Sequence, residues 1–186
     1  MKKMTFAVPL LAACFGHAAQ ATALPDNEEL AALVRADQGD RTAEVDWKAV
    51  NQRDKERRDK VGAMLAAGQV RTGRDYYNAA MVFQHGETPD DYALAFSLTT
   101  IARKLAPDHP APKWLFAAAF DRYLLSHNMP QWYGTQSMIP HGSSTETLRP
   151  LDPNAVTDEE RQALNVPRLQ EKMAEIAENN AKRQAK

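Results

Sequence analysis

One histidine and one aspartate are the side chains of this sequence best suited to move protons. His85 lies near the end of a predicted helix, and Asp121 lies near the end of a second one. A histidine ring gains or loses a proton near neutral pH, and a neighbouring carboxylate can orient that ring or act as the base itself. His85 and Asp121 are therefore the candidate acid and base of a hydrolase or transferase.

A second set of side chains is suited to hold a polar ligand. Arginine donors bind carboxylates or phosphates through a fork of N–H groups, amides bind peptides or sugars, and an aromatic ring can stack on a ligand. The candidate binding residues are Asp37, Arg41, Gln84, Arg122, Gln131, Tyr133, Thr135 and Gln136. No nucleophilic cysteine accompanies them, because the only cysteine is Cys14.

Each of these residues also has a structural alternative. The helix dipole favours a histidine such as His85 at a helix C-terminus whatever the function. Asp121 and Arg122 can instead form an ion pair that ties two helices together. The segment 131–137 can be a corner in which Gly134 takes a positive φ and the amides cap the backbone.

The sequence offers no pattern for a metal or a cofactor. No two of its five histidines have the i,i+4 spacing of metal ligands, and its eight glycines are scattered rather than gathered in a phosphate loop. We therefore expect neither a metal site nor a bound cofactor.

The elements that must position these side chains are helices. Apolar residues recur at helical spacing in a first segment that opens at 25–26 and carries 37–41 at its far end, and in a second from 46 to 68. Further helices are predicted in segments that begin at Thr72, Thr88 and Pro112. Proline and acidic residues after Thr88 are a strong helix start, and 157–160 forms a capping box that opens a short helix. A last helix begins at Pro167.

A weak repeat links two of these helices. Shifted by about 37 positions, Tyr77, Ala80 and Phe83 coincide with Trp114, Ala117 and Phe120. The sequence thus predicts a mainly α single domain of packed helical hairpins, irregular and tetratricopeptide-like. Prolines and glycines in 131–155 exclude a continuous helix, so a loop or a small β-hairpin is expected there.

Two further expectations concern the surface and the core. The eight charged residues 53–60 predict a solvated helix face joined by i,i+4 pairs, with a charged docking face as the alternative. Trp47, Trp114 and Phe120 are expected in the core.

The first residues have the pattern of an export signal. Lys2 and Lys3 precede a short apolar stretch and small residues, so 1–23 is predicted to be a signal peptide. The protein is then periplasmic or secreted; alternatively, a lipoprotein signal would leave it anchored through a lipid on Cys14. The remaining chain is expected to form one helical domain over 24–176 and a frayed tail over 177–186.

The charge balance limits the partners. Without Lys2 and Lys3 the basic count falls from 23 to 21 against 24 acidic residues, a net charge of −3. Nucleic-acid binding needs a basic surface, so it is not expected, and no apolar run is long enough for a transmembrane helix.

Several short motifs occur in one order: Asp37-Gln38-x-x-Arg41, Gln84-His85, Asp121-Arg122, Gln131-x-Tyr133-Gly134-Thr135-Gln136 and Glu160-Arg161. This series resembles a bacterial family known as a domain of unknown function, over roughly residues 30 to 173. The resemblance implies a helical fold and a set of residues, but no reaction. Gln162 stands where members of that family often carry a second arginine, so a paired-arginine site is not expected.

The motifs lie near matching ends of neighbouring predicted helices. We expect them to meet at one end of the bundle, under the segment that follows residue 130. Two functions fit such a site. The first is a binding or interaction module for a peptide, a glycan, a small polar ligand or an envelope protein; the second is a small hydrolase or transferase.

Overall fold

The chain folds into seven helices and one two-stranded sheet over the residues that the computed structural model describes, 24–42 and 45–185. The helices are α1 (Glu28–Gly39), α2 (Trp47–Ala66), α3 (Gly73–Phe83), α4 (Pro89–Leu105), α5 (Ala111–Ser126), α6 (Asp158–Ala163) and α7 (Leu169–Gln184), and the strands are β1 (Ser137–Met138) and β2 (Thr147–Leu148). The predicted signal segment 1–23, with Cys14, lies outside the described residues.

Short polar signals open the helices as the sequence predicts. Thr88 accepts a hydrogen bond from the backbone N–H of Asp91, and the Asp91 carboxylate accepts one from Thr88 in return. Thr157 and Glu160 form the same capping box at the start of α6. These caps satisfy N–H groups that have no partner within the helix.

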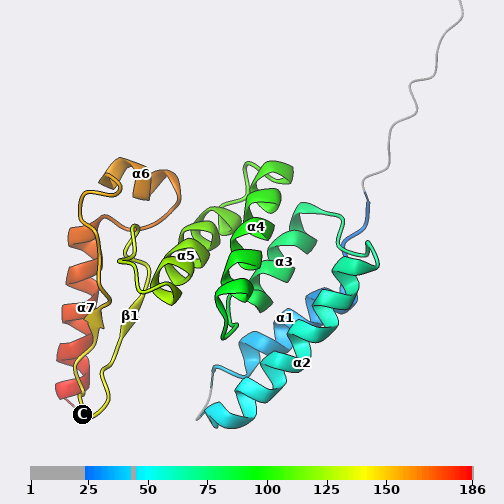
Figure 1. Cartoon of the computed structure of the whole chain (residues 1–186). Helices are drawn as coiled ribbons and strands as arrows, with labels where there is room; N and C mark the ends of the chain where they lie inside the picture. The colour runs from blue at the N-terminus through cyan, green and yellow to red at the C-terminus, as the bar shows by residue number, and fades with distance from the viewer. Residues whose placement is uncertain (1–23, 43–44, 186) are drawn as a thin grey trace, which may run out of the picture.

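Helix α3 is the centre of the helical part. It packs against α1, α2 and α4, and α4 packs in turn against α5. The five helices therefore lie side by side in Figure 1, with consecutive helices forming hairpins. The predicted mainly α domain is confirmed.

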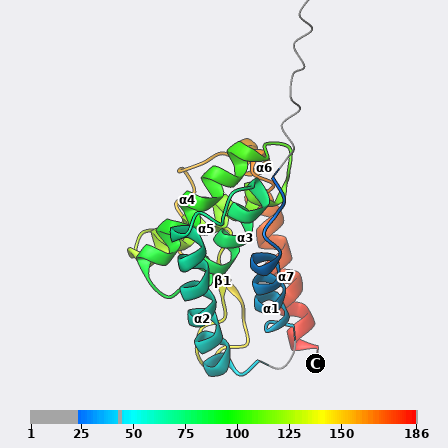
Figure 2. The ribbon, with the colours of Figure 1, turned by 90° about the vertical axis from the view of Figure 1, so that its right-hand side faces the viewer.

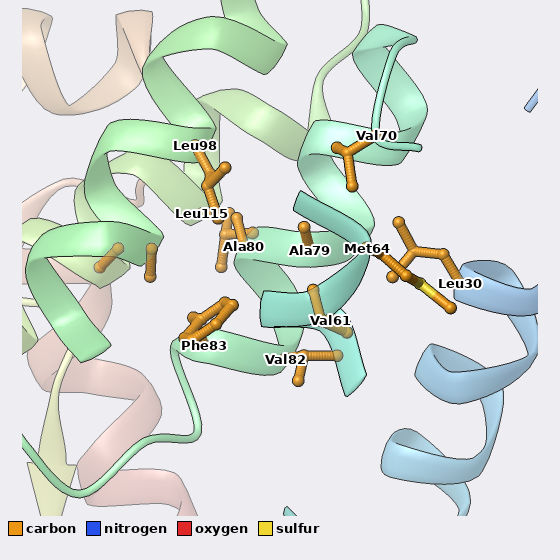
Figure 3. Packing of buried hydrophobic residues seen from close by; sticks show 12 residues of the cluster. Leu30, Val61, Met64, Val70, Ala79, Ala80, Val82, Phe83, Leu98 and Leu115 are labelled. Atoms are coloured by element: carbon orange, nitrogen blue, oxygen red, sulfur yellow. The ribbon is translucent and has the colours of Figure 1, made fainter. Parts of the chain in front are cut away.

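The core lies on both sides of α3 (Figure 3). On one side, Leu30 of α1 and Met64 of α2 lie near Ala79. On the other side, Ala80 lies near Leu98 of α4 and Leu115 of α5, which belong to the same cluster. The alanines of α3 are fully buried, and their small side chains allow neighbouring helices to approach closely.

The expected aromatic core is only partly correct. Trp47 is 60% exposed and Trp114 is 39% exposed. Trp47 is the first residue of α2, and this end of the helix extends below α3 in Figures 1 and 2. Phe120 is half-buried, and its ring contacts that of Phe96 with centroids 5.0 Å apart.

The last third of the chain contains the predicted hairpin. β1 and β2 are antiparallel, and Ser137 pairs with Leu148. Helix α7 packs against β2, and both lie at the opposite end of the molecule from α1 and α2 in Figure 1.

Helix α7 extends further than the sequence predicts. We expected the chain to fray after Ile176, but the helix continues to Gln184. Asn180 holds its second half to the hairpin, because its side chain accepts a hydrogen bond from the Glu146 N–H (2.7 Å) and donates one to the Glu146 carbonyl (2.9 Å). Within 24–42 and 45–185, no helix has both the length and the apolar character that crossing a membrane requires.

Candidate functional site

His85 lies against Asp37, not against Asp121. Its Nδ1 is 3.0 Å from the Asp37 carboxylate, and the two residues come from the ends of α1 and α3. Arg41, one turn after Asp37, donates to the Asp37 carbonyl (2.6 Å) and carboxylate (3.1 Å). The structure thus brings the Asp37–Arg41 and Gln84–His85 motifs together, as expected from the sequence.

Gln84 completes the environment of the histidine ring. Its Nε2 is 3.0 Å from Nε2 of His85, so a ring that donates from Nδ1 to Asp37 accepts from this amide. Both ring nitrogens are then engaged. The Gln84 side-chain oxygen is buried and has no hydrogen-bond partner among the described residues.

Helix α2 adds three buried charged residues that the sequence analysis missed. Asp54 accepts hydrogen bonds from Arg41 and from Arg57. Arg57 also donates to Asp40 at 2.7 Å, and Arg58 donates to the His85 carbonyl at 3.2 Å. The run 53–60 is therefore solvated on one side only, where pairs such as Lys55–Asp59 lie.

A signal for these residues was present in the sequence. Val50, Asp54, Arg57, Val61 and Met64 recur every three or four residues, and all of them are buried. Charged residues inside an apolar helical stripe indicate that the stripe faces a partner able to pair with them.

The ionic cluster shifts the acidity of its carboxylates. Burial alone would raise the pKa of Asp37, but the hydrogen bond and charge of His85, the charge of Arg41 and the Gln38 amide outweigh burial and lower this pKa. Hydrogen bonds from Arg53 and Arg57 lower the pKa of Asp40 from 3.8 to about 2. Both carboxylates are therefore held in the charged form.

Asp121 lies outside the His85 cluster and binds the segment that follows α5. Its fully buried carboxylate accepts the backbone N–H groups of Trp132, Tyr133 and Thr135, each at 2.9 Å, and the Thr135 hydroxyl at 2.7 Å. Burial raises the pKa of Asp121, and these four donors oppose the rise. All of the hydrogen bonds go to the segment after α5.

Gln131 and Gln136 also serve this segment. The fully buried Gln131 amide donates to the carbonyls of Gln136 (2.9 Å) and Arg149 (3.0 Å), and its oxygen accepts the Gln136 N–H. The Gln136 amide donates to the Thr135 hydroxyl. Gly134 takes φ +77° between them.

Arg161 closes the same corner from the other side. Its guanidinium donates to the carbonyls of Trp132 (3.0 Å), Tyr133 (3.2 Å) and Val156 (3.0 Å). The Tyr133 ring lies edge-on to Phe120, with centroids 6.2 Å apart. The segment 131–137 thus has the geometry of the structural alternative, a corner that satisfies its own backbone through Asp121 and Arg161.

The expected single cluster is therefore divided. Asp37, Arg41, Gln84 and His85 meet at the ends of α1 and α3, whereas Asp121, Gln131, Thr135 and Gln136 form the corner. Asp121 and Arg122 face different surroundings because adjacent helical residues point about 100° apart. Asp121 turns toward the corner, and Arg122 turns away from it.

Arg122 lines a small cavity beside the His85 cluster. The cavity has a volume of about 250 Å³ and is lined by Glu87, Pro89, Tyr92, Arg122, Leu125, Ser126 and Arg149. Burial lowers the pKa of Arg122; Tyr92 opposes this, while the positive charges of Arg41 and Arg149 act in the same direction as burial. The Nε atom of Arg122 is buried and has no hydrogen-bond partner in the described part of the chain.

Arg122 also lacks the ion pair considered from the sequence. Asp121 is occupied by the corner, and no other carboxylate of residues 24–42 and 45–185 lies within ion-pair distance of the Arg122 guanidinium. Those residues likewise contain no group of three or more His, Cys, Asp or Glu side chains placed to hold a metal ion.

Comparisons of the chain with protein-family models, with curated proteins and with solved structures find no match. Its chemistry must be inferred from its own residues. Of the sequence-predicted site residues, Arg122 is the one that lines this cavity, and its charge has no carboxylate partner within 24–42 and 45–185.

Proposed function

We propose that this protein is a binding module of the bacterial cell envelope that recognises a small polar ligand, such as part of a peptide or glycan, in the cavity beside Arg122. The envelope location rests on the signal-like pattern of residues 1–23. The bacterial origin rests on the motif series that resembles a domain of unknown function.

The observation that carries the proposal is the contrast between Arg122 and its polar neighbours. Asp37, Arg41 and His85 are bonded to one another, and Asp121 is bonded to the corner. Arg122 alone among these lines the cavity, and its buried Nε atom has no hydrogen-bond partner among the described residues. A cavity that carries a guanidinium group without a carboxylate partner among the described residues suits the recognition of a polar ligand.

The same contacts give less support to the hydrolase or transferase alternative. His85 and Asp121 have separate partners, and both ring nitrogens of His85 are engaged. A general base needs hydrogen-bond access to the proton that it removes. Neither residue lines the cavity at Arg122.

Thermal unfolding in the presence of ligand pools tests the proposal. The purified protein is mixed with fractionated envelope metabolites and peptidoglycan fragments, and its melting temperature is measured. A ligand that binds only the native state raises the melting temperature. At a free ligand concentration of a hundred times Kd, it adds about 2.7 kcal/mol to the free energy of unfolding.

The matched variants are Arg122→Ala and Arg35→Ala. Arg35 is an exposed arginine of α1 and does not line the cavity. We expect Arg122→Ala to lose the shift and Arg35→Ala to keep it. A pool that never shifts the wild-type protein, or a shift that Arg122→Ala retains, contradicts the proposal.

A further inference from the structure

We infer that the cavity beside Arg122 is an anion subsite, which takes a carboxylate or a phosphate group of the ligand between Arg122 and Arg149. This inference rests on the proposed binding function and specifies its ligand chemically.

The first argument is that the charge of Arg122 is uncompensated. Arg57, Arg58 and Arg161 are buried, and each has a carboxylate partner, at 2.6, 3.6 and 3.2 Å respectively. Arg122 is half-buried, and its Nε atom is buried. Arg122 has none among the described residues. A partly buried charge loses some of its hydration, and an anion that binds it with good geometry compensates for this loss.

The second argument is the distribution of charge around the cavity. Arg149 lines the cavity together with Arg122, and Arg41 is near enough for its charge to lower the pKa of Arg122. Glu87 is the one acidic residue of the lining, and it is exposed. Two arginines against one exposed glutamate leave the cavity positive, so it favours an anion.

The third argument comes from the hydroxyl groups of the lining. The Tyr92 hydroxyl donates to the Gly86 carbonyl (2.7 Å), and the Ser126 hydroxyl donates to the Tyr123 carbonyl (2.7 Å). Their protons are already used. The donors left for a ligand are therefore the guanidinium groups, whose planar forks match the oxygens of carboxylates and phosphates.

The size of the cavity limits what enters it. Sites for whole drug-sized ligands measure roughly 300–1,000 Å³, and this cavity measures about 250 Å³. It accommodates the acidic group and its nearest atoms, while the rest of the ligand lies outside the cavity.

Defined probes test the inference on the whole purified protein. Sodium acetate, sodium phosphate and neutral acetamide are titrated at constant ionic strength set with sodium chloride, and the melting temperature and the amide NMR spectrum are recorded. We expect acetate or phosphate, but not acetamide, to raise the melting temperature and to shift signals at the cavity. Whichever anion acts at the lower concentration identifies the source as carboxylate or phosphate.

Three variants separate a specific site from general charge. Arg122→Met removes the charge at similar length and is expected to weaken anion binding by at least about thirtyfold. Arg149→Ala, at an exposed position, is expected to weaken it about two- to fivefold. If Arg122→Met does not fold, Arg122→Lys, which keeps the charge but loses the fork, must still bind the preferred anion more weakly than the wild type.

The outcomes also distinguish the inference from the proposed function. If neutral ligands from the pools bind in an Arg122-dependent manner and both anions fail, the binding function stands and the anion subsite is overturned. If anions act equally on the wild type and on Arg122→Met, they bind elsewhere and the subsite is also overturned. If the pools and the probes all fail, the proposed function is overturned as well.

Discussion

At the scale of single residues, Asp121 decides the shape of the segment after α5. One carboxylate accepts four hydrogen bonds from Trp132, Tyr133 and Thr135. Three of the donors are backbone N–H groups of a segment without regular structure, which would otherwise be buried without partners. A residue that resembles a catalytic base in the sequence is thus an anchor of the backbone.

Asp121→Asn tests this role. The substituted amide places an NH₂ group against donors that need an acceptor, so at least one buried N–H loses its bond. We expect the free energy of unfolding to fall by about 2–4 kcal/mol, as measured by urea denaturation. Asp108→Asn, at an exposed loop position, should change it by less than about 0.5 kcal/mol, and equal effects of the two substitutions would contradict the anchoring role.

At the scale of the elements, local sequence determines where α2 ends, and tertiary contacts determine how its buried charges are paired. Its C-terminus is set locally, because Gly68 takes φ +65° and the next residue, Gln69, donates to the Met64 carbonyl at 2.9 Å. This is a Schellman motif, which a glycine at that position favours. Its buried charges, by contrast, depend on partners from α1.

Two glycine-to-alanine substitutions, one within α2 and one just after it, should change the stability in opposite directions. Gly68→Ala forces a side chain into the left-handed region and should destabilise the protein by about 1 kcal/mol. Gly62 lies within α2, and a methyl group added there would meet no atom within 4 Å. Gly62→Ala should therefore stabilise the protein by about 0.5–1 kcal/mol. Thermal unfolding of both variants checks the pair, and a loss of stability in Gly62→Ala would show that our account of this helix is incorrect.

The ionic contacts between the end of α1 and α2 should make the free energy of unfolding depend on pH in the acidic range. The folded-state pKa of Asp40 is lowered from 3.8 to about 2, and a depressed carboxyl pKa adds stability above the unfolded value that is lost as the pH falls through the folded value. Urea denaturation should therefore show the free energy of unfolding decreasing as the pH is lowered from about 5 to about 2.

Asp40→Asn is the matched variant for this pH series. It removes the titrating group, so part of the decrease should disappear. Arg53→Gln removes a main donor to the same carboxylate and should also flatten the curve. Curves parallel to that of the wild type in both variants would exclude this cluster as a source of the acid sensitivity.

At the scale of the whole molecule, α7 closes the end opposite to α1 and α2 (Figure 1). A two-stranded hairpin alone is marginally stable in water, and this one is held by α7 through Asn180 and through Arg183, 3.4 Å from the Glu146 carboxylate. The last turns of the chain therefore stabilise residues some 34 positions earlier in the sequence.

Asn180→Ala should loosen this end without unfolding the helices. It removes both side-chain bonds to the Glu146 backbone, and hydrogen exchange at the hairpin amides should accelerate by about tenfold. The exposed Lys182 offers the control Lys182→Ala, which should leave the exchange rates unchanged. Unchanged hairpin exchange in Asn180→Ala would mean that α7 is not what holds the hairpin.

The sequence by itself determined the helical class, the hairpin near 137–148 and most helix starts, because caps, prolines and apolar periodicity act within a few residues. It also placed Asp37 and Arg41 with Gln84 and His85. Only the tertiary structure decided which polar groups pair with one another. Asp121 and Arg122 are neighbours in the chain yet face different surroundings, and Arg57 lies in a run that looks solvated. Burial and pairing depend on which helix lies opposite, and contacts between helices distant in sequence fix that choice.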